Sequence, residues 1–300
     1  MKIGLIAEFN PFHNGHKYLI KKIKENFPNS KLIVALSCDY VQRGEIAVAS
    51  FEDRKKIAME NGVDEVYELD FYTSTQAAHI FAKGAIDLLL SKRINILAFG
   101  VSDTNNVNKY IDAANAIKSN IEKYNLNLKK FLKEGRSFVY SSFESLKILI
   151  KEEDIPEDIL GFEYVKYIVN NNLPIVPFCV KRTVSHLSEN VNGKYASATF
   201  LRKMISEGKD ISEYSPMKII NSFTKIENKY SLFQNIVRNT KPEELEKIML
   251  MSEGMENLFK KNIDLPTYEE FVNACTSRRY TNSRIKRVIL YTILGIKKVD

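Results

Sequence analysis

The run KIGLIAEFNPFHNGH, residues 2–16, contains the features that decide the fold. Its first six residues, 2–7, are mostly apolar and predict a buried strand. Two histidines, His13 and His16, then flank Gly15 at the point where helical sequence begins. Because a helix N-terminus presents unpaired N–H groups and a glycine lets the backbone approach a ligand closely, this strand–turn–helix pattern predicts a phosphate-binding loop.

The two histidines point to a particular chemistry. Because His13 and His16 are three residues apart, both imidazoles can lie on one side of the first helical turn. Two hydrogen-bond donors placed there would stabilise the charge that develops on a triphosphate as pyrophosphate leaves. Asn10-Pro11 predicts a rigid turn that aims the loop. The alternative is that the histidines only cap the helix or bind a metal, but their place directly after an apolar first strand favours the phosphate chemistry.

The same alternation of apolar strands and helical patterns continues along the chain. Further strands are predicted at residues 31–37, 63–69, 95–99 and 173–180, and helices at 16–26, 51–61, 75–91, 107–118, 159–171 and 197–206. Residues 119–155 read as irregular or helical. This pattern predicts an α/β fold, a Rossmann-like doubly wound parallel sheet with helices on both faces, which binds its ligand at the carboxyl ends of the strands near the switch point of strand order.

Strand patterns are absent from the last part of the sequence. From about residue 215 onward, three or four helical patterns run to residue 300. We therefore predict two domains: an ATP-binding α/β domain at residues 1–214 and a smaller helical domain at residues 215–300.

The positive charge is concentrated near the C-terminus. Residues 271–300 contain seven basic residues and one acid, so they account for +6 of the net charge of +7. Such a segment attracts polyanions, of which nucleic acid is the commonest, and Tyr280 lies within it. Charge alone leaves open the alternative that these residues form a solvated helix face.

Composition indicates an ordinary globular protein. Hydrophobic residues make up 44% and charged residues 27% of the 300 residues. No apolar run approaches the roughly 18 residues that a membrane helix needs, and no signal-peptide pattern appears, so a cytoplasmic location is expected. Three widely spaced cysteines without a Cys-x-x-Cys pair predict buried free thiols rather than a zinc site or disulfides.

The loop NPFHNGH, residues 10–16, resembles the His-x-Gly-His motif of the nucleotidyltransferase superfamily. The chain as a whole resembles one bacterial family, the tRNA(Met) cytidine acetate ligases. The resemblance covers most of the chain in order, through segments 41–45 (VQRGE), 61–64 (NGVD), 81–85 (FAKGA), 159–164 (ILGFEY), 195–199 (YASAT) with Arg202, and the basic segment 278–287. It implies that ATP and acetate form acetyl-adenylate and that the acetyl group then passes to N4 of the wobble cytidine of elongator tRNA(Met).

The resemblance also implies roles for individual residues. His13 and His16 are expected to be catalytic, and ATP is expected to contact Ala7, Glu8, Phe9, Asn10, Pro11, Phe12, His13, Asn14, Gly15, His16, Gly100, Arg182, Ser197, Thr199 and Arg202. The tRNA is expected to contact Arg278, Arg279, Arg284, Lys286 and Arg287. Magnesium is expected to screen the phosphates, although no dedicated metal cluster is visible in the sequence.

Other polar residues near these segments have less specific patterns. Gln42, Arg43 and Glu45 are expected to form an exposed polar loop that positions acetate or cytidine. Ser197 could equally be an ordinary helix cap. His79 lies on an apolar helix and reads as a core residue, and His186 as an inert loop residue or one that approaches the nucleotide.

The chain departs from the family pattern in two places. Gly100-Val101-Ser102 stands where the family has Gly-Ser-Glu, and Pro156-Glu157-Asp158 where it favours Pro-Asn-Asn. An acid beside ATP is expected to repel phosphate or to alter base contacts. Two alternatives to the ligase stay open: an adenylyltransferase acting on a small phosphorylated metabolite, which the histidine motif fits equally well, and a non-catalytic tRNA-binding homologue, which these departures suggest.

Overall fold

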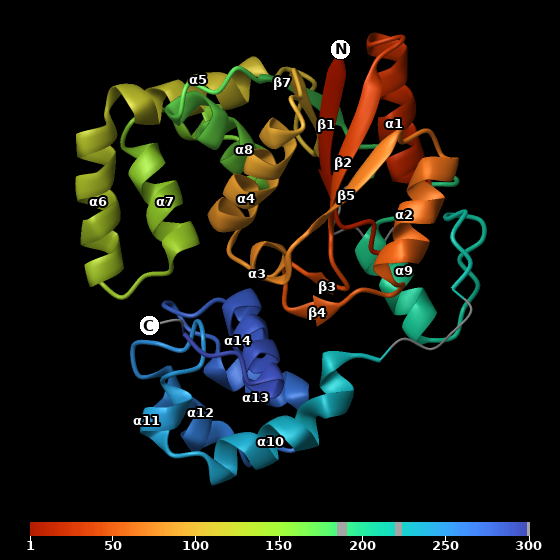
Figure 1. Ribbon diagram of the computed structural model, residues 1–300. Helices are drawn as coiled ribbons and strands as arrows, with labels where there is room; N and C mark the ends of the chain where they lie inside the picture. The colour runs from red at the N-terminus through yellow and green to blue at the C-terminus, as the bar shows by residue number, and fades with distance from the viewer. Residues whose placement is uncertain (185–190, 220–223, 299–300) are drawn as a thin grey trace.

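The computed structural model describes residues 1–184, 191–219 and 224–298 (Figure 1). Its main sheet contains five parallel strands in the order β5-β2-β1-β6-β7. Their bounds are Lys2–Ala7 (β1), Lys31–Ser37 (β2), Glu65–Leu69 (β5), Ile96–Val101 (β6) and Val176–Lys181 (β7). Because the connections change direction between β1 and β6, the carboxyl end of β1 lies at the switch point. The predicted doubly wound α/β fold is confirmed.

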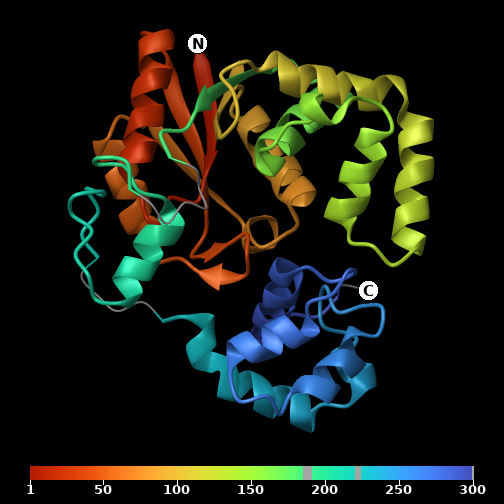
Figure 2. The ribbon, with the colours of Figure 1, turned by 180° about the vertical axis from the view of Figure 1, so that it is seen from behind.

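Helices cover both faces of this sheet (Figures 1 and 2). Successive side chains of a strand point to opposite faces, so β2 contributes Leu32 and Val34 to one core and Ile33 and Ala35 to the other. The first core includes residues of α1 (Asn14–Asn26) and α2 (Phe51–Glu60). The second includes residues of α4 (Ala78–Ser91), α5 (Asn108–Ser119) and α8 (Ile159–Asn170). Burial on both faces explains why the strands read as nearly continuous apolar runs.

Smaller elements complete this part of the chain. They are β3 (Tyr40–Val41), β4 (Glu45–Ile46), α3 (Phe71–Ser74), α6 (Ile121–Lys133), α7 (Phe138–Lys147), the 3-10 turn η1 (Glu152–Asp154) and α9 (Ala198–Ser206). Helices α6 and α7 pack on each other as a pair, so residues 119–155 are mainly helical (Figure 1). The antiparallel hairpin β3–β4 was not predicted, because two-residue strands leave no periodic pattern.

Residues 224–298 are mainly helical. They contain η2 (Ile226–Lys229), α10 (Tyr230–Asn239), α11 (Pro242–Leu245), α12 (Met255–Asn262), α13 (Tyr268–Cys275) and α14 (Asn282–Leu294), more helices than the three or four predicted. These helices share a buried cluster of their own, centred on Phe233, Phe259 and Phe271, whose ring centroids lie 5.1–5.7 Å apart. Edge-to-face aromatic contacts of this kind stabilise a small core beyond the area they bury.

None of the helices in the described part of the chain is long and apolar enough to cross a membrane. The cysteines Cys38, Cys179 and Cys275 are free and buried.

Helix α14 packs directly against the β3–β4 hairpin. Gly44, at the tip of the hairpin, has a left-handed φ of +77°, and a Cβ added there would lie 2.7 Å from both Cα and N of Arg287. Nearby, the hydroxyl groups of Thr75 and Tyr291 form a 2.7 Å hydrogen bond between the α3–α4 connection and α14. The helical region therefore meets the α/β region through backbone contact at Gly44.

Gly44→Ala is expected to destabilise the protein by about 2–4 kcal/mol, because a left-handed backbone costs a non-glycine residue about 1–2 kcal/mol and crowding adds about as much again. Urea unfolding would measure the change. Gly208→Ala is the matched control, since Gly208 has a φ of +70° but nothing within 4 Å of an added Cβ. Equal losses for the two variants would show that the contact with α14 is not tight.

Candidate active site

The loop after β1 is held from two directions. The side-chain oxygen of Asn10 accepts a hydrogen bond from the N–H of Val48 at 2.8 Å, and the Asn10 carbonyl accepts one from Nη1 of Arg202 at 2.8 Å. Phe9 has a left-handed φ of 47°, and the Asn10–Pro11 peptide is cis. The predicted turn is thus present, and its partners come from segments far away in the sequence.

His13 and His16 form a reciprocal cap at the start of α1. Nδ1 of His13 accepts a hydrogen bond from the N–H of Gly15 at 3.0 Å, and Nδ1 of His16 accepts one from the N–H of His13 at 3.1 Å. The two rings stack with their centroids 3.7 Å apart. An Nδ1 atom that accepts a hydrogen bond is unprotonated, so the proton of each neutral ring is on Nε2. The capping alternative and the phosphate role are therefore compatible, because capping uses Nδ1 and leaves Nε2–H as a donor.

The surroundings keep both imidazoles neutral. Burial lowers the pKa of His13 to about 4, and the positive charges of Arg182 and Arg202 lower it as well. Burial also places the pKa of His16 well below its usual value, with His13 and Arg182 adding to the effect. Arg202 also contacts the histidine loop directly, through its hydrogen bond to the Asn10 carbonyl. The site thus combines two neutral donors with two guanidinium groups, a set suited to a polyphosphate.

Arg182 follows β7 and reaches across the end of β6. Its Nη1 lies 2.8 Å from Oδ2 of Asp158, and its Nε lies 3.2 Å from the position that a Cβ on Gly100 would occupy. Gly100 is the second-last residue of β6, which ends two residues later than the predicted strand at 95–99. The space beside Gly100 is taken by the arginine side chain. Asp158 also caps α8 by accepting the N–H of Gly161 at 2.9 Å.

Asp158→Asn is expected to lower the KM for ATP by about three- to tenfold. Asn caps a helix as well as Asp does, but it removes a negative charge beside the expected phosphate site, worth about 1 kcal/mol of repulsion. Steady-state kinetics at varied ATP would measure this change. A higher KM would instead show that the carboxylate is needed to hold Arg182 in place.

Helix α9 supplies the remaining predicted phosphate ligands. Ser197 caps this helix by accepting the N–H of Phe200 at 3.0 Å, as the alternative interpretation had it. Nη2 of Arg202 donates to Oγ1 of Thr199 at 3.2 Å, while its Nη1 bonds Asn10 in the loop. Arg202 therefore joins the start of α9 to the histidine loop. His186 lies outside the described residues.

The hairpin residues differ from their prediction. Gln42, Arg43 and Glu45 are half-buried rather than exposed, because the hairpin lies between the histidine loop and α14. The N–H of Gln42 donates to Oε1 of Glu8 at 2.9 Å, and Glu45 forms a 2.9 Å ion pair with Lys286. The hairpin thus links the predicted ATP loop to the predicted tRNA-binding helix.

The basic segment is not the exposed stripe that the sequence suggested. Arg278 is exposed, but Arg279 is half-buried with Nη2 only 3.2 Å from where a Cβ on Gly135 would lie, and Arg284 donates to Oγ of Ser252 at 2.7 Å. Arg287 is buried, with 6% of its surface exposed. Arg284 and Arg287 do lie close along α14, but the face that includes Arg287 packs on the hairpin.

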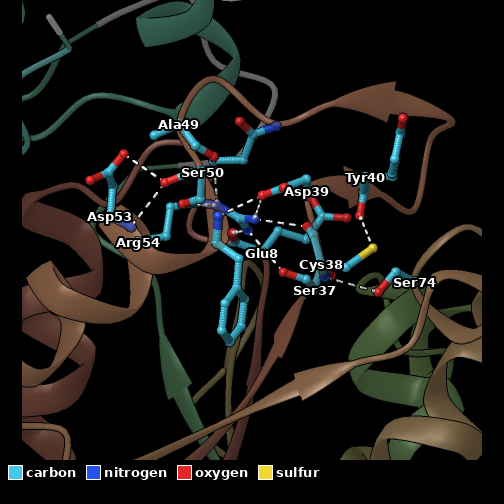
Figure 3. A network of polar contacts seen from close by, with 12 residues as sticks. Glu8, Ser37, Cys38, Asp39, Tyr40, Ala49, Ser50, Asp53, Arg54 and Ser74 are labelled. Carbon is cyan, nitrogen blue, oxygen red and sulfur yellow. Dashed lines mark hydrogen bonds and ion pairs between the residues drawn. The ribbon is translucent and has the colours of Figure 1, made fainter.

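Arg54, which the sequence did not single out, is the centre of a polar network that includes Glu8, just before the histidine loop (Figure 3). Its guanidinium is fully buried and donates to five carbonyl oxygens, 2.7–3.3 Å away, belonging to Glu8, Ser37, Cys38, Ala49 and Ser50. Asp39 lies 3.7 Å from its Nη2. These carbonyls come from the ends of β1 and β2 and the loop before α2, so one side chain ties three segments together. An arginine on a charged helix reads as surface, and no pattern in the sequence distinguishes it.

His79 was predicted to be a core residue, but the structure does not bury it fully. It is half-buried, and its ring lies 4.3 Å from that of Phe138 on α7. Burial lowers the pKa of His79, which is therefore neutral near pH 7.

Comparisons with known proteins agree with this geometry. Residues 1–300 match the family described as HIGH Nucleotidyl Transferase. A tRNA(Met) cytidine acetate ligase of Mycoplasmopsis pulmonis is 54% identical over 99% of this chain and 100% of its own length, and one of Fusobacterium nucleatum is 33% identical over 98% and 76%. The crystal structure of apo Thermotoga maritima TmcAL matches with a TM-score of 0.89 at 28% identity, covering 99% of this chain and 76% of that one. The same protein bound with alpha-thio ATP matches with a TM-score of 0.87 at 28% identity, covering 99% and 75%.

Proposed function

This chain belongs to the tRNA(Met) cytidine acetate ligase family of HIGH nucleotidyltransferases, and we propose that it joins acetate to N4 of the wobble cytidine of elongator tRNA(Met) at the cost of ATP. The observation that supports the proposal most directly is the stacked pair of His13 and His16, neutral and with Nε2 available, beside Arg182 and Arg202 at the switch point of the sheet. The similarity to named ligases extends over the full length of those proteins and supports tRNA(Met) as the substrate.

The first step is formation of acetyl-adenylate. A carboxylate oxygen of acetate attacks the α-phosphorus of ATP, the bond to the β-phosphate oxygen breaks, and pyrophosphate leaves. His13 and His16 donate from Nε2 to the oxygens on which negative charge develops, while Arg182 and Arg202 hold the β- and γ-phosphates. The loop of residues 7–16, Gly100, Ser197 and Thr199 complete the proposed ATP site.

Magnesium would accompany the nucleotide. Within the described ranges, no group of three or more His, Cys, Asp or Glu side chains is placed to hold a metal ion. We propose that Mg²⁺ is bound mainly by the phosphates and water, which is its usual preference with nucleotide substrates.

The second step is transfer to RNA. N4 of the cytidine attacks the acetyl carbonyl carbon, AMP leaves, and N4 loses a proton. We propose that residues 1–214 bind ATP and that residues 215–300 bind tRNA, with Arg278, Arg279, Arg284, Lys286 and Arg287 around the approach. Contact of α14 with the hairpin, and of the hairpin with Glu8, supports this division of labour, because it places the basic helix close to the ATP loop.

The decisive experiment incubates the purified protein with unmodified elongator tRNA(Met), ATP and acetate, then digests the tRNA to nucleosides for mass spectrometry. N4-acetylcytidine that depends on all three components is the expected result. Reactions without acetate, and with an ATP analogue that cannot be cleaved between the α- and β-phosphates, are the controls. If pyrophosphate is released while the tRNA stays unmodified, the tRNA substrate is wrong. If neither product forms, the enzyme assignment is wrong.

A further inference from the structure

Helix α7, which belongs to the α/β region, has an exposed strip of apolar side chains with a cation beside it. Val139, Tyr140 and Phe143 are 46%, 41% and 40% exposed. Because residues three and four positions apart share a helix face, these three side chains are neighbours. The guanidinium carbon of Arg136 lies 4.9 Å from the centroid of the Tyr140 ring. We call Arg136, Val139, Tyr140 and Phe143 the α7 platform.

Packing of the helix does not account for this strip. Helix α7 is buried through another face, which includes Ser141, Ser145 and Leu146. Single exposed apolar residues are ordinary, but adjacent exposed aromatic rings indicate a surface that a partner covers.

The charge around the platform favours an anionic partner. Residues 129–147 contain five basic and two acidic residues, a net charge of +3. Lys147 pairs with Glu152 at 3.0 Å, whereas Arg136 forms no ion pair with any residue that the structure describes. Aromatic rings beside an available guanidinium are the combination with which proteins hold single-stranded nucleic acid.

The start of α7 is connected to the ATP loop. The ring centroid of Phe138, the first residue of α7, lies 4.3 Å from that of His79 in the first turn of α4. Three residues before His79, the carbonyl of Gln76 accepts a hydrogen bond from Nε2 of Gln42 at 2.9 Å. The N–H of Gln42 in turn donates to Glu8, in the proposed ATP loop.

The turn before α7 meets the helical region on its other side. Figures 1 and 2 both place the turn between α6 and α7 beside that region. Nη2 of Arg279 lies 3.2 Å from the position that a Cβ on Gly135, in this turn, would occupy. An RNA strand that contacts the basic segment 278–287 and enters the ATP site can therefore also reach the α7 platform.

We propose that the α7 platform stacks an unpaired nucleobase of the RNA substrate. Unpaired bases expose flat π surfaces that stack on aromatic rings and on guanidinium planes, whereas bases inside a duplex do not. Tyr140 and Phe143 supply the rings, and Arg136 supplies the charge for an adjoining phosphate. The inference rests on the proposed function and extends the RNA-binding surface from residues 215–300 onto the ATP-binding domain.

Tyr140→Ala and Phe143→Ala test the platform, with the anticodon stem-loop of elongator tRNA(Met) as the probe. Each variant of the full-length protein is expected to bind it about 5- to 150-fold more weakly, the loss that follows removal of one stacked base. Tyr140→Phe should bind as the wild type does, because it keeps the ring. Arg136→Met should make the slope of log affinity against log salt shallower by about 0.7, the contribution of one single-strand phosphate.

Two controls separate stacking from general attraction. A blunt duplex with the sequence of the stem should bind the wild type and Tyr140→Ala equally, because it offers no unpaired base. Leu126→Ala removes an exposed apolar side chain on α6, outside the platform, and should leave stem-loop affinity unchanged. Melting temperatures of the platform variants should lie within about 3 °C of the wild type, as for other surface substitutions.

Several results would overturn the inference. Unchanged stem-loop affinity in both alanine variants would remove the platform from RNA binding, and an equal loss for the blunt duplex would remove base stacking. Wild-type protein that self-associates, and that Tyr140→Ala makes monomeric without a change in RNA affinity, would assign this face to a second copy of the chain. If the wild type does not bind the stem-loop at all, the proposed function fails first, which is distinct from failure of the platform alone.

Discussion

His16→Ala and His13→Ala are each expected to slow acetyl-adenylate formation by about a hundred- to a thousandfold, or about 2.7–4 kcal/mol of transition-state stabilisation. This is the loss that follows removal of one preorganised donor from a site of developing negative charge. Exchange of labelled pyrophosphate into ATP in the presence of acetate measures this step without tRNA. The variants should fold, although each loses part of the α1 cap, at about 0.5–2 kcal/mol.

The pH dependence of the exchange reaction tests how the histidines act. Because the pKa of His13 is lowered to about 4, the ring is a neutral donor from pH 5.5 to 8, and the rate should show no step near pH 6.5 from this residue. The unfolded chain binds the proton more tightly than the folded protein does. The contribution of His13 to the free energy of unfolding should therefore be fully present above about pH 6.5 and should be lost as the pH falls towards 4.

His79→Ala is the matched control for these variants. His79 is also half-buried and packed on an aromatic ring, but it contacts Phe138 rather than the histidine loop. Its loss should leave pyrophosphate exchange near wild type. Full exchange activity in His13→Ala or His16→Ala would remove the proposed donor role, and a rate that falls as the pH rises through about 6.5 would mean that a protonated histidine is needed.

The sequence was sufficient for the parts of the fold that depend on local pattern. The bounds of β1 and β2 agree with the prediction because apolar runs buried on both faces end abruptly at polar or turn residues. Strand β7 was expected to begin at residue 173, but it begins at Val176, since Pro174 and Ile175 belong to the connection before it. The β3–β4 hairpin escaped prediction because its form depends on contacts with α14 and the histidine loop.

In the candidate site too, local features could be predicted from the sequence and contacts between distant segments could not. His13 and His16 are close in sequence, so one helical turn was enough to bring them together. Arg182 and Arg202 were connected to them through a resemblance, and only folding of the chain places them beside the loop. The spacing of Arg284 and Arg287 indicated that they lie close along a helix, but spacing does not tell which face meets solvent. Hence Arg287 was expected outside and is inside.

Arg54 shows the limit most clearly, and its replacement is the second large effect that we expect. Arg54→Met should lower the free energy of unfolding by about 3–5 kcal/mol, because five carbonyl oxygens lose the donor that a fully buried guanidinium supplies. Arg54→Lys should lose less, since an ammonium group can still reach some of these oxygens. Urea unfolding at constant pH would measure both changes.

Lys56→Met provides the comparison, because Lys56 lies two residues further along α2 and is exposed. Its effect should stay within about 0.5 kcal/mol. Arg54 also holds the carbonyl of Glu8 at 2.7 Å, immediately before the histidine loop. If the Arg54→Lys variant folds, it should therefore bind ATP more weakly, which pyrophosphate exchange would show as a raised KM for ATP. Arg54 itself does not touch the nucleotide in this proposal. If the free energy of unfolding of Arg54→Met instead lies within about 1 kcal/mol of the wild-type value, the carbonyl oxygens must find other donors. The histidine loop then does not depend on this arginine.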